Sequence, residues 1–365
     1  MSRILYFTRD YTPHDHRFLS KLAETGHQIF YLQLERRGHA LEDRPLPPQI
    51  ELLHWKGGLS PATLLDGPRL LIDLRRVLRE LQPDLVQAGP IQRSAFLVAL
   101  SGYQPLVSMS WGYDLIRDAH RNPFWRWATR YTLRHSAVMI GDCNTIRQLA
   151  VSFGMPDERI VTFPWGVDLE RFTLGPQPGC GQTFTLLSTR GWEPIYGVDV
   201  IAEAYVQAAR QCPELRLVML GNGSQAALLR QIFQHGGVQD QVLFPGQISQ
   251  ADLPRIYHAC DLYLSASHSD GTSISLLEAL ACGRPALVSD IPGNREWVTP
   301  SENGWWFADG DASELAGAIL NAFAQRHQLP GMSRAARRIA EERADWHKNF
   351  PSTLQAYEMA LTSPR

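Results

Sequence analysis

The segment S-A-S-H-S-D-G-T-S-I-S-L-L-E-A-L-A-C-G-R-P, residues 265–285, gives the clearest indication of architecture in the 365-residue chain. The apolar run Leu262–Leu264 predicts a strand before it, and a helix is expected to begin near Ile274, after a glycine-containing turn. That helix is apolar on nearly every side apart from Ser275 and Glu278, which is typical of a buried helix. Because a buried carboxylate is costly unless it is paired or hydrogen-bonded, Glu278 needs a partner.

Two interpretations of Glu278 are open on the residues themselves. In the first, Glu278 forms a buried salt bridge, for which Arg284 is a nearby candidate. In the second, its carboxylate accepts hydrogen bonds from the ribose diol of a nucleotide, while the unpaired amides at the helix start hold the attached phosphates. A second carboxylate, Asp270, stands just before the turn Gly271–Ser273 and eight residues before Glu278.

Along the chain, short apolar runs alternate with longer helical patterns, which predicts βαβ units and parallel sheets. A chain of this length and pattern is expected to form two α/β domains, each Rossmann-like, facing each other across a cleft. Strands are expected at Ile4–Thr8, Gln28–Leu32, Asp84–Gln87, Leu106–Met109, Ala137–Ile140, Phe184–Leu187, Leu215–Leu220, Val242–Phe244, Leu262–Leu264 and Ala286–Val288. Helices are expected at Phe18–Glu24, Trp125–Arg134, Ala312–Ala324, Ser333–Arg343 and Trp346–Leu361.

A stretch dense in Gly and Pro, residues 173–183, divides the chain and is interpreted as a linker. The N-terminal domain is then residues 1–172 and the C-terminal domain residues 184–345. The final helix, within residues 346–365, lies beyond the last expected strand and is expected to pack back on the N-terminal domain. Because parallel sheets bind ligands beyond the carboxyl ends of their strands, residues directly after each strand are the candidates for a site.

The composition excludes several classes of protein. The formal net charge is −2, so a general attraction to nucleic acid is not expected. Five cysteines without a C-x-x-C pair favour free thiols over a zinc site or a disulfide framework. The N-terminus has too short an apolar run for a signal peptide, and no run is long enough to span a bilayer. A cytoplasmic protein without a cofactor is expected.

The segment D-G-T-S-I-S-L-L-E resembles the E-x7-E signature of retaining glycosyltransferases of glycosyltransferase family 4, with Asp270 and Glu278 at the two acidic positions. Four further segments resemble the same family in order and spacing. They are F-P-W-G-V-D-L-E-R-F (163–172), L-L-S-T-R-G-W-E-P-I-Y-G (186–197), L-R-L-V-M-L-G-N-G-S (215–224) and I-P-G-N-R-E-W-V with E-N-G-W-W-F (291–307). The resemblance implies the GT-B fold, two facing Rossmann-like domains, and transfer of a sugar from a nucleotide diphosphate donor, expected to be a UDP or GDP sugar.

The resemblance also implies roles on the donor side. Asp270 would contact the donor sugar, Glu278 the nucleoside ribose, and the amides between them the diphosphate. Arg190 stands where the family carries an arginine, and it is expected to meet the charge of the departing phosphates. The family commonly adds a lysine a few residues later, where this chain has Tyr196. Either Arg190 and the helix amides suffice, or another arginine, Arg284 or Arg295, enters the site.

The candidate catalytic residues are Asp270, Glu278 and Arg190. The donor-binding set is Gly221, Asn222, Gly223, Tyr196, Gln247, Ile248, Gly271, Thr272, Ser273, Ile274, Ser275 and Glu278. The two glycines of the 221–226 segment imitate a dinucleotide fingerprint, but the acid that this motif requires after the next strand is absent, so we interpret them as allowing close approach of the backbone to a donor diphosphate or sugar. The single D-x-D, residues 309–311, precedes a helix and is expected to cap it, so no metal is expected.

The acceptor side is less well indicated. The segment after the first strand, residues 8–18, lacks the glycines that many family members have there and carries His14, His16 and Arg17 instead. Trp111 stands where many members have a histidine. If Trp111 replaces that histidine, two routes are open. Either His14, His16 or Asp114 polarises the acceptor hydroxyl, or the departing phosphate oxygen takes the proton of this hydroxyl and no base is needed. The alternative for the 14–17 cluster is an ordinary helix start.

The segment 121–135 interleaves arginines with aromatic residues, and Arg126, Arg130 and Arg134 recur at a spacing of four. Such a helix is compatible with contact to an anionic membrane that carries a lipid-linked acceptor. The commoner structure with this pattern is a domain helix that has one aromatic core face and one solvated basic face.

Three classes of function therefore remain. The leading one is a retaining, metal-independent glycosyltransferase acting on a glycan, a lipid-linked sugar or a small molecule. A nucleotide-sugar 2-epimerase and a non-catalytic sugar-nucleotide binder of the same fold are the alternatives. A pyridoxal-phosphate phosphorylase is excluded because no lysine lies between Lys56 and Lys348. The missing ribose acid disfavours an NAD oxidoreductase, and the missing G-K-[ST] disfavours a P-loop enzyme.

Overall fold

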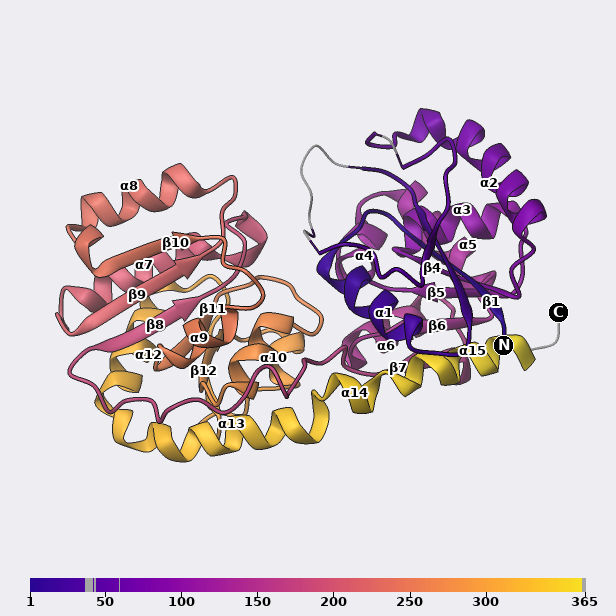
Figure 1. The fold of residues 1–365 in the computed structure, drawn as a ribbon. Coiled ribbons are helices and arrows are strands. Elements are labelled where there is room, and N and C mark those ends of the chain that lie inside the picture. The colour runs from indigo at the N-terminus through magenta and orange to yellow at the C-terminus, as the bar shows by residue number, and fades with distance from the viewer. Residues whose placement is uncertain (37–41, 43, 59, 363–365) are drawn as a thin grey trace. The chain divides into compact units, whose positions relative to one another are not determined.

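The computed structural model describes residues 1–36, 42, 44–58 and 60–362. The chain forms two compact units, one built from Met1–Phe163 with Phe350–Arg365 and the other from Pro164–Asn349 (Figure 1). The expected linker, residues 173–183, lies within the second unit. No helix among the described residues is long and apolar enough to cross a membrane.

The first unit is organised around a seven-stranded parallel sheet with the order β3-β2-β1-β4-β5-β6-β7. Its strands are β1 (Arg3–Thr8), β2 (Gln28–Gln33), β3 (Glu51–Leu52), β4 (Leu85–Gly89), β5 (Leu106–Met109), β6 (Val138–Gly141) and β7 (Ile160–Thr162). Its helices are α1 (Pro13–Ala23), α2 (Gly67–Leu81), α3 (Phe96–Ser101), α4 (Tyr113–Ile116), α5 (Pro123–Arg134), α6 (Asn144–Ser152) and α15 (Pro351–Thr362). In the register of this sheet, Tyr6 of β1 lies between Tyr31 and Gln87.

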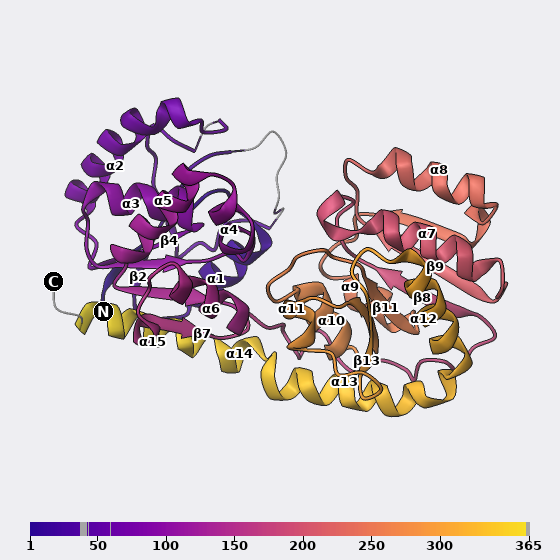
Figure 2. The same ribbon diagram turned by 180° about the vertical axis from the view of Figure 1, so that it is seen from behind.

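The second unit contains a six-stranded parallel sheet with the order β10-β9-β8-β11-β12-β13. Its strands are β8 (Phe184–Ser188), β9 (Leu215–Leu220), β10 (Val242–Gly246), β11 (Leu262–Ser265), β12 (Ala286–Ser289) and β13 (Gly304–Phe307). Its helices are α7 (Val198–Ala209), α8 (Ala226–Gly236), α9 (Leu253–His258), α10 (Ile274–Ala281), α11 (Pro292–Arg295), α12 (Ala312–Ala324), α13 (Leu329–Arg343) and α14 (Trp346–Asn349). Helices α7, α8 and α12 cover one face of the sheet, and α9, α10 and α13 cover the other (Figures 1 and 2).

Both sheets are covered by helices, which explains why the strands read as continuous apolar runs rather than as alternating patterns. Helix α10 shows the same effect, because Leu276, Leu277, Ala279 and Leu280 are all fully buried. The expectation of a buried helix in this segment is confirmed.

The C-terminal end differs from the single helix that was expected. Pro351 cannot donate a backbone hydrogen bond and restricts the residue before it, so the helical pattern is interrupted at Phe350 and divides into α14 and α15. Helix α15 packs against β4, β5, β6 and β7 of the first sheet, and the Tyr357 hydroxyl donates to the side-chain carbonyl of Gln87. The end of the chain therefore returns to the first unit, as expected.

In both sheets the strand order reverses at one point, between β1 and β4 in the first and between β8 and β11 in the second. Parallel α/β sheets bind ligands outside the carboxyl ends of the strands at such a switch point. The loops after these four strands are therefore the places where a site is expected.

Candidate functional site

Two residues of the predicted donor site meet at the switch point of the second sheet. Arg190 follows β8 and Asp270 follows β11, and their side chains form an ion pair with 2.7 Å between the guanidinium Nη2 and the carboxylate Oδ2. The side chains are 12% and 21% exposed, so the pair is sheltered yet within reach of a ligand. The two residues are 80 positions apart in the chain, and the adjacency of β8 and β11 brings them together.

Three further groups hold the Arg190 guanidinium in place. It lies over the ring of Tyr196 at 4.1 Å from the centroid, and it donates to the hydroxyls of Ser273 at 2.8 Å and Ser275 at 3.3 Å. Tyr196 thus reaches the site through Arg190, as a cation–π partner in the position where the family commonly has a lysine.

Ser273 is the residue that precedes α10, yet its hydroxyl does not cap that helix. The hydroxyl accepts from Arg190 and also contacts the Ser275 hydroxyl at 3.1 Å. The first amides of α10 are therefore not satisfied by the usual side-chain cap. Such amides favour an anion.

Glu278 lies one turn into α10, is 4% exposed, and accepts a hydrogen bond of 2.9 Å from the hydroxyl of Tyr257 in α9. Burial, with the charge of Glu278 next, raises the pKa of Tyr257 well above its ordinary value, so the phenol stays protonated and remains a donor. The same hydroxyl lies 3.1 Å from the Ser275 carbonyl oxygen and 3.2 Å from the Thr189 hydroxyl.

These contacts join six of the predicted residues into one network that also contains residues we did not predict; the six are Arg190, Tyr196, Asp270, Ser273, Ser275 and Glu278. The Tyr263 hydroxyl of β11 bonds the Ser275 hydroxyl at 2.8 Å, and Thr189 contacts Tyr257. Thr189, Tyr257 and Tyr263 have no motif of their own in the sequence. Only their strand-end or helix positions, together with the polar tip on a buried aromatic ring, could have indicated them.

The alternative interpretation of Glu278 was a salt bridge with Arg284. The structure instead directs the Arg284 guanidinium to backbone carbonyl oxygens. Arg284 is 1% exposed and donates to three carbonyl oxygens, those of Cys260 at 2.7 Å, Cys282 at 3.2 Å and Pro176 at 2.5 Å. Its role is to fasten the segment around Pro176 to the second unit. Because its guanidinium is engaged by these three carbonyl oxygens, Arg284 is not an additional cation of the donor site.

Arg295, the other alternative cation, pairs with Asp290 at 2.5 Å on an exposed surface and lies over Trp306. It too is engaged elsewhere. Arg190 is therefore the cation that the structure places beside Asp270 and the start of α10.

The two glycines after β9 are required by close packing between two loops of the second unit. A Cβ at Gly223 would lie 2.4 Å from the carbonyl oxygen of Trp192, and Gly221, with a φ of +100°, would meet the Arg190 carbonyl oxygen at 3.1 Å. The Trp192 amide in turn donates to the Asn222 carbonyl oxygen at 3.0 Å. The glycines therefore let the 221–223 loop pack on the loop that carries Arg190.

Gln247 and Ile248 follow β10, which lies at the edge of the sheet two strands from β8. Gln247 is exposed, whereas Ile248 packs on the apolar cluster that contains α10. Within the described part of the chain, no hydrogen bond or ion pair joins either residue to the Arg190 network, and their donor role stays a prediction. Gly271 and Thr272 are buried between Asp270 and the start of α10, and their donor role also stays a prediction.

The two aspartates of the D-x-D segment have different partners. Asp311 caps α12 by accepting from the amides of Ser313 and Glu314, which confirms the expected capping. Asp309 bonds the Nδ1 atom of His268 at 2.6 Å. Within the described residues, no group of three or more His, Cys, Asp or Glu side chains is arranged to hold a metal ion.

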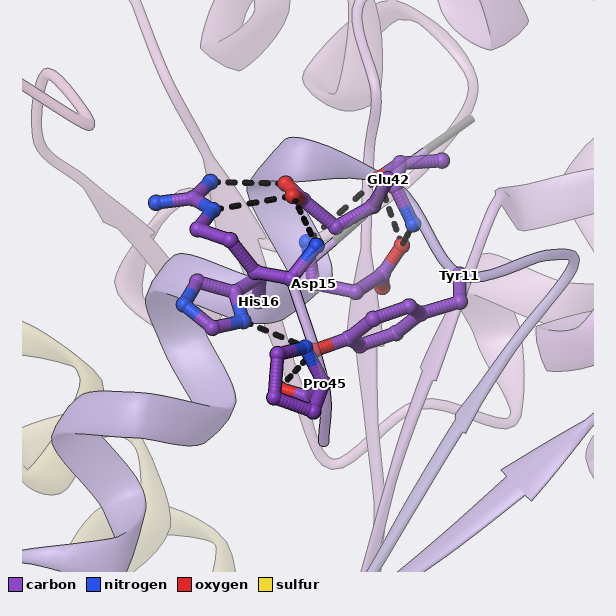
Figure 3. A network of polar contacts seen from close by, with 7 residues as sticks. Tyr11, Asp15, His16, Glu42 and Pro45 are labelled. Atoms are coloured by element: carbon purple, nitrogen blue, oxygen red, sulfur yellow. Dashed lines mark hydrogen bonds and ion pairs between the residues drawn. The ribbon is translucent and has the colours of Figure 1, made fainter. Parts of the chain in front are cut away.

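The predicted acceptor-side residues gather near the carboxyl end of β1. The His16 Nδ1 atom bonds the Tyr11 hydroxyl at 2.7 Å, and the Tyr11 hydroxyl also lies 3.3 Å from the Pro45 carbonyl oxygen (Figure 3). His14 stacks edge-on against Trp111, with 5.4 Å between ring centroids. Arg17 is half-buried in the first turns of α1. The helix-start interpretation of this cluster is also supported, because Thr12 and Asp15 form a capping box.

Asp114 differs from its expected role. It is fully buried, and its two carboxylate oxygens accept from the Ser110 hydroxyl and from the amides of Ile91, Trp111 and Leu115 at 2.6–3.1 Å. These donors organise the loops after β4 and β5. A carboxylate engaged in this way holds loops and does not reach an acceptor hydroxyl.

The two buried aspartates of the first unit predict how stability changes with pH. Burial raises the pKa of Asp15 to about 7 and that of Asp114 to about 6, whereas an unfolded aspartate titrates near ~3.9. Between the unfolded and folded pKa the folded state binds more protons, so the free energy of unfolding is expected to fall as the pH rises from about 4 to about 7. Asp15→Asn should flatten this slope when urea midpoints are compared between pH 5 and 8. Identical slopes for both proteins would contradict the assignment.

Helix α5 contains the arginine stripe. Trp125, Ala128 and Leu133 pack inward, whereas Arg126, Arg130 and Arg134 are exposed. Phe124 and Trp127 are 44% and 48% exposed on the same helix. The helix therefore has an apolar inner face, as the commoner interpretation requires, and it also presents aromatic rings beside its basic stripe.

Two Rossmann-like units with parallel sheets define the chain as a protein of the GT-B class. HepE from Anabaena, solved in complex with UDP, is 18% identical with a TM-score of 0.78, covering 98% of this chain and 99% of that one. Sucrose-phosphate synthase from Thermosynechococcus elongatus is 16% identical with a TM-score of 0.79, covering 98% of each chain. The GT-B fold expected from the sequence is confirmed.

Residues 14–171 match the family described as Glycosyltransferase Family 4, and residues 181–343 match Glycosyl transferases group 1. The chain belongs to glycosyltransferase family 4, as the motif resemblance indicated. A GDP-mannose-dependent alpha-(1-6)-phosphatidylinositol monomannoside mannosyltransferase from Mycobacterium tuberculosis is 23% identical over 95% of both chains. The UDP-N-acetylglucosamine--peptide N-acetylglucosaminyltransferase GtfA subunit from Streptococcus gordonii is 30% identical over 169 residues, 46% of this chain. The chain spans 32% of that relative and 52% of a D-inositol 3-phosphate glycosyltransferase from Geodermatophilus obscurus, about a third to a half of their lengths.

Proposed function

We propose that the chain is a retaining glycosyltransferase that moves a sugar from a nucleotide-diphosphate donor to a hydroxyl acceptor. One observation carries the proposal: Asp270, Arg190 and Glu278 belong to a single network at the switch point of the second sheet. Relatives of this chain are named for UDP or GDP-mannose donors, which supports a nucleotide sugar and leaves the base to be determined by experiment.

Each member of the network has a chemical task. Glu278, with one oxygen held by Tyr257, accepts hydrogen bonds from the ribose diol. Arg190 and the open amides of α10 receive the diphosphate, and they supply positive charge as the leaving group departs, without a metal. The Asp270 carboxylate, fixed by Arg190, accepts hydrogen bonds from hydroxyls of the donor sugar.

The proposed transfer balances without a separate base. The bond between the anomeric carbon and the phosphate oxygen breaks, and the acceptor oxygen bonds to the same face of the anomeric carbon, so the configuration is retained. The departing phosphate oxygen takes the proton of the acceptor hydroxyl. The engagement of Asp114 by four protein donors agrees with a route that does not use it. His14 and His16 then contribute by orienting the acceptor.

A thermal-shift panel tests the donor assignment. Saturating UDP, GDP or ADP should raise the melting temperature by several degrees for the correct base, because a ligand that binds only the folded state stabilises it by RT ln(1 + [L]/Kd). Glu278→Ala should weaken nucleotide binding about 100-fold or more, since two hydrogen bonds to a charged group are lost. The Glu278→Gln variant keeps the shape and should retain part of the affinity.

A matched control is Glu302→Ala, which removes an exposed carboxylate paired with Arg338 and should leave the nucleotide shift unchanged. The panel is followed by incubation with the matching nucleotide sugar and acceptors. Transfer with retention supports the proposal, whereas isomerisation of the donor without an acceptor, or nucleotide binding unaffected by Glu278→Ala, would overturn it.

The acceptor is proposed to be reached at a membrane surface through α5. Exposed Phe124 and Trp127 suit the interface, and Arg126 and Arg130 are complementary to anionic headgroups. Flotation with vesicles should increase with the fraction of phosphatidylglycerol and fall when Arg126 and Arg130 are both replaced by Gln. The matched control is the pair Arg75 and Arg79, which has the same spacing on α2. Flotation that is independent of anionic lipid would contradict this part of the proposal.

A further inference from the structure

A second group of side chains, outside the donor site, converges at the switch point of the first sheet. Arg9 follows β1, Arg93 lies in the short π-helical segment Ile91–Ala95 after β4, and Tyr113 begins α4 after β5. Strands β1, β4 and β5 are neighbours in the sheet, so their carboxyl ends bring these residues to one edge.

Arg93 is a half-buried cation that forms no direct ion pair among the described residues. Its guanidinium lies over the ring of Trp125 at 5.4 Å, and within the described residues nothing accepts a hydrogen bond from it or forms an ion pair with it. Burial, and then the charge of Arg9, lower the pKa of Arg93, whereas the charges of Glu35 and Asp118 raise it. Arg121 lies on the same Trp125 ring at 5.6 Å and adds a further positive charge.

The carboxylates in this region are engaged by other groups. Glu35 is almost fully buried and bonds the Arg9 Nε atom at 2.5 Å and the Ala62 amide at 2.9 Å. Asp118 pairs with Arg117 at 3.3 Å. A partly desolvated guanidinium without an acceptor is unfavourable, so an anion from outside the protein would be stabilised beside Arg93.

Tyr113 supplies a neutral donor at the same place. Its side chain interacts with Arg9, and burial raises the pKa of the phenol to about 12, so the hydroxyl keeps its proton. The residue as a whole is 37% exposed, so part of its ring faces solvent while the hydroxyl is desolvated. Two guanidinium groups and a phenol at the same edge of the sheet offer several N–H and O–H donors, which suits a tetrahedral oxyanion.

We propose that Arg93, with Arg9 and Tyr113, binds a phosphate group carried by the acceptor, either on a soluble molecule or on a lipid headgroup. The inference rests on the proposed function, because it assigns the acceptor to the first unit. It selects phosphorylated alcohols and phosphodiesters over neutral glycans as the substrate class.

The test measures binding of glycerol 3-phosphate, with glycerol as the neutral counterpart, by titration calorimetry. Arg190→Ala protein is used so that the anion site of the second unit does not contribute. Replacing Arg93 by Gln should weaken glycerol 3-phosphate binding at least ~10-fold, which corresponds to the loss of about 1.4 kcal/mol. Arg93→Met, which keeps the packing on Trp125, should behave in the same way. Arg79→Gln, which replaces an exposed arginine of α2, should leave binding unchanged.

A second arm distinguishes the two sources of phosphate. Vesicles containing phosphatidic acid are compared with phosphatidylcholine vesicles, each with wild-type and Arg93→Gln protein. Arg93-dependent binding of glycerol 3-phosphate or of phosphatidic acid supports the proposal and identifies the source. Binding of neither probe, or equal binding by the Arg93 variants, overturns it. Nucleotide thermal shifts are recorded in parallel with otherwise wild-type protein, so that failure of the proposed function is seen separately as absence of any nucleotide shift.

Discussion

Replacing Arg190 by Ala is expected to lower kcat about 10²- to 10³-fold, the effect of removing one preorganised donor to developing charge. Arg190 contacts Asp270, Ser273 and Ser275, so its position is fixed before a donor arrives. A fixed cation lowers the barrier to phosphate departure without reorganising in the transition state. Arg190→Lys keeps the charge but loses the planar fork, so it should recover only part of the rate. The measurement is steady-state kinetics with the donor and acceptor that the panels identify.

The control for Arg190 is Arg295, which makes the same kinds of contact in an exposed place. Arg295 pairs with Asp290 and lies over Trp306, and its side chain is 56% exposed. Arg295→Ala should change kcat less than about 2-fold, because the pair is solvated and contributes little. A loss of activity in Arg295→Ala as large as that in Arg190→Ala would contradict the assignment of Arg190 as the cation of the site.

The parts of this site that the sequence predicted are those for which local pattern and tertiary position agree. Asp270, Ser273 and Glu278 lie within nine residues, and the strand and helix around them follow from apolar patterning. Once that helix is buried, the carboxylate of Glu278 must find a partner inside the protein. The sequence therefore indicated the polar residue correctly and left its partner open.

The partner could not be predicted, because it depends on helix packing between distant segments. Tyr257 lies on α9 and reaches Glu278 across the buried face of α10, 21 residues away. Arg284 was closer in sequence, yet its guanidinium found three carbonyl oxygens instead. Asp114 was misassigned for the same reason. A carboxylate after a strand suggests a site, and only the fold shows that neighbouring amides already engage it.

The order of the strands in each sheet could not be predicted from the sequence pattern either. The alternation of strands and helices predicts two parallel sheets, but pairing of β8 with β11 is what brings Arg190 next to Asp270. Short edge strands such as β3 and β7 were missed, since two or three residues carry too little periodicity.

Gly197→Ala is expected to destabilise the second unit by about 3 kcal/mol and to weaken donor binding as well. Gly197 follows Tyr196 and has a φ of +56°, and a Cβ there would lie 2.1 Å from the carbonyl oxygen of Ala266. Ala266 begins the loop that leads to Asp270. The added methyl group must therefore push the loop that carries Tyr196 away from the loop that carries Asp270. Urea unfolding and the nucleotide thermal shift measure the two effects.

Two other glycines separate the causes of this loss. Gly237 has a φ of +71° with open space around its Cβ position, so Gly237→Ala should cost only about 1 kcal/mol for backbone strain. Gly317 is an exposed residue within α12 with open space and no unusual φ, so Gly317→Ala should stabilise the chain by about 0.5–1 kcal/mol. Neither variant should alter the nucleotide shift. If Gly197→Ala cost no more than Gly237→Ala, the close contact with Ala266 would not be what holds the two loops together.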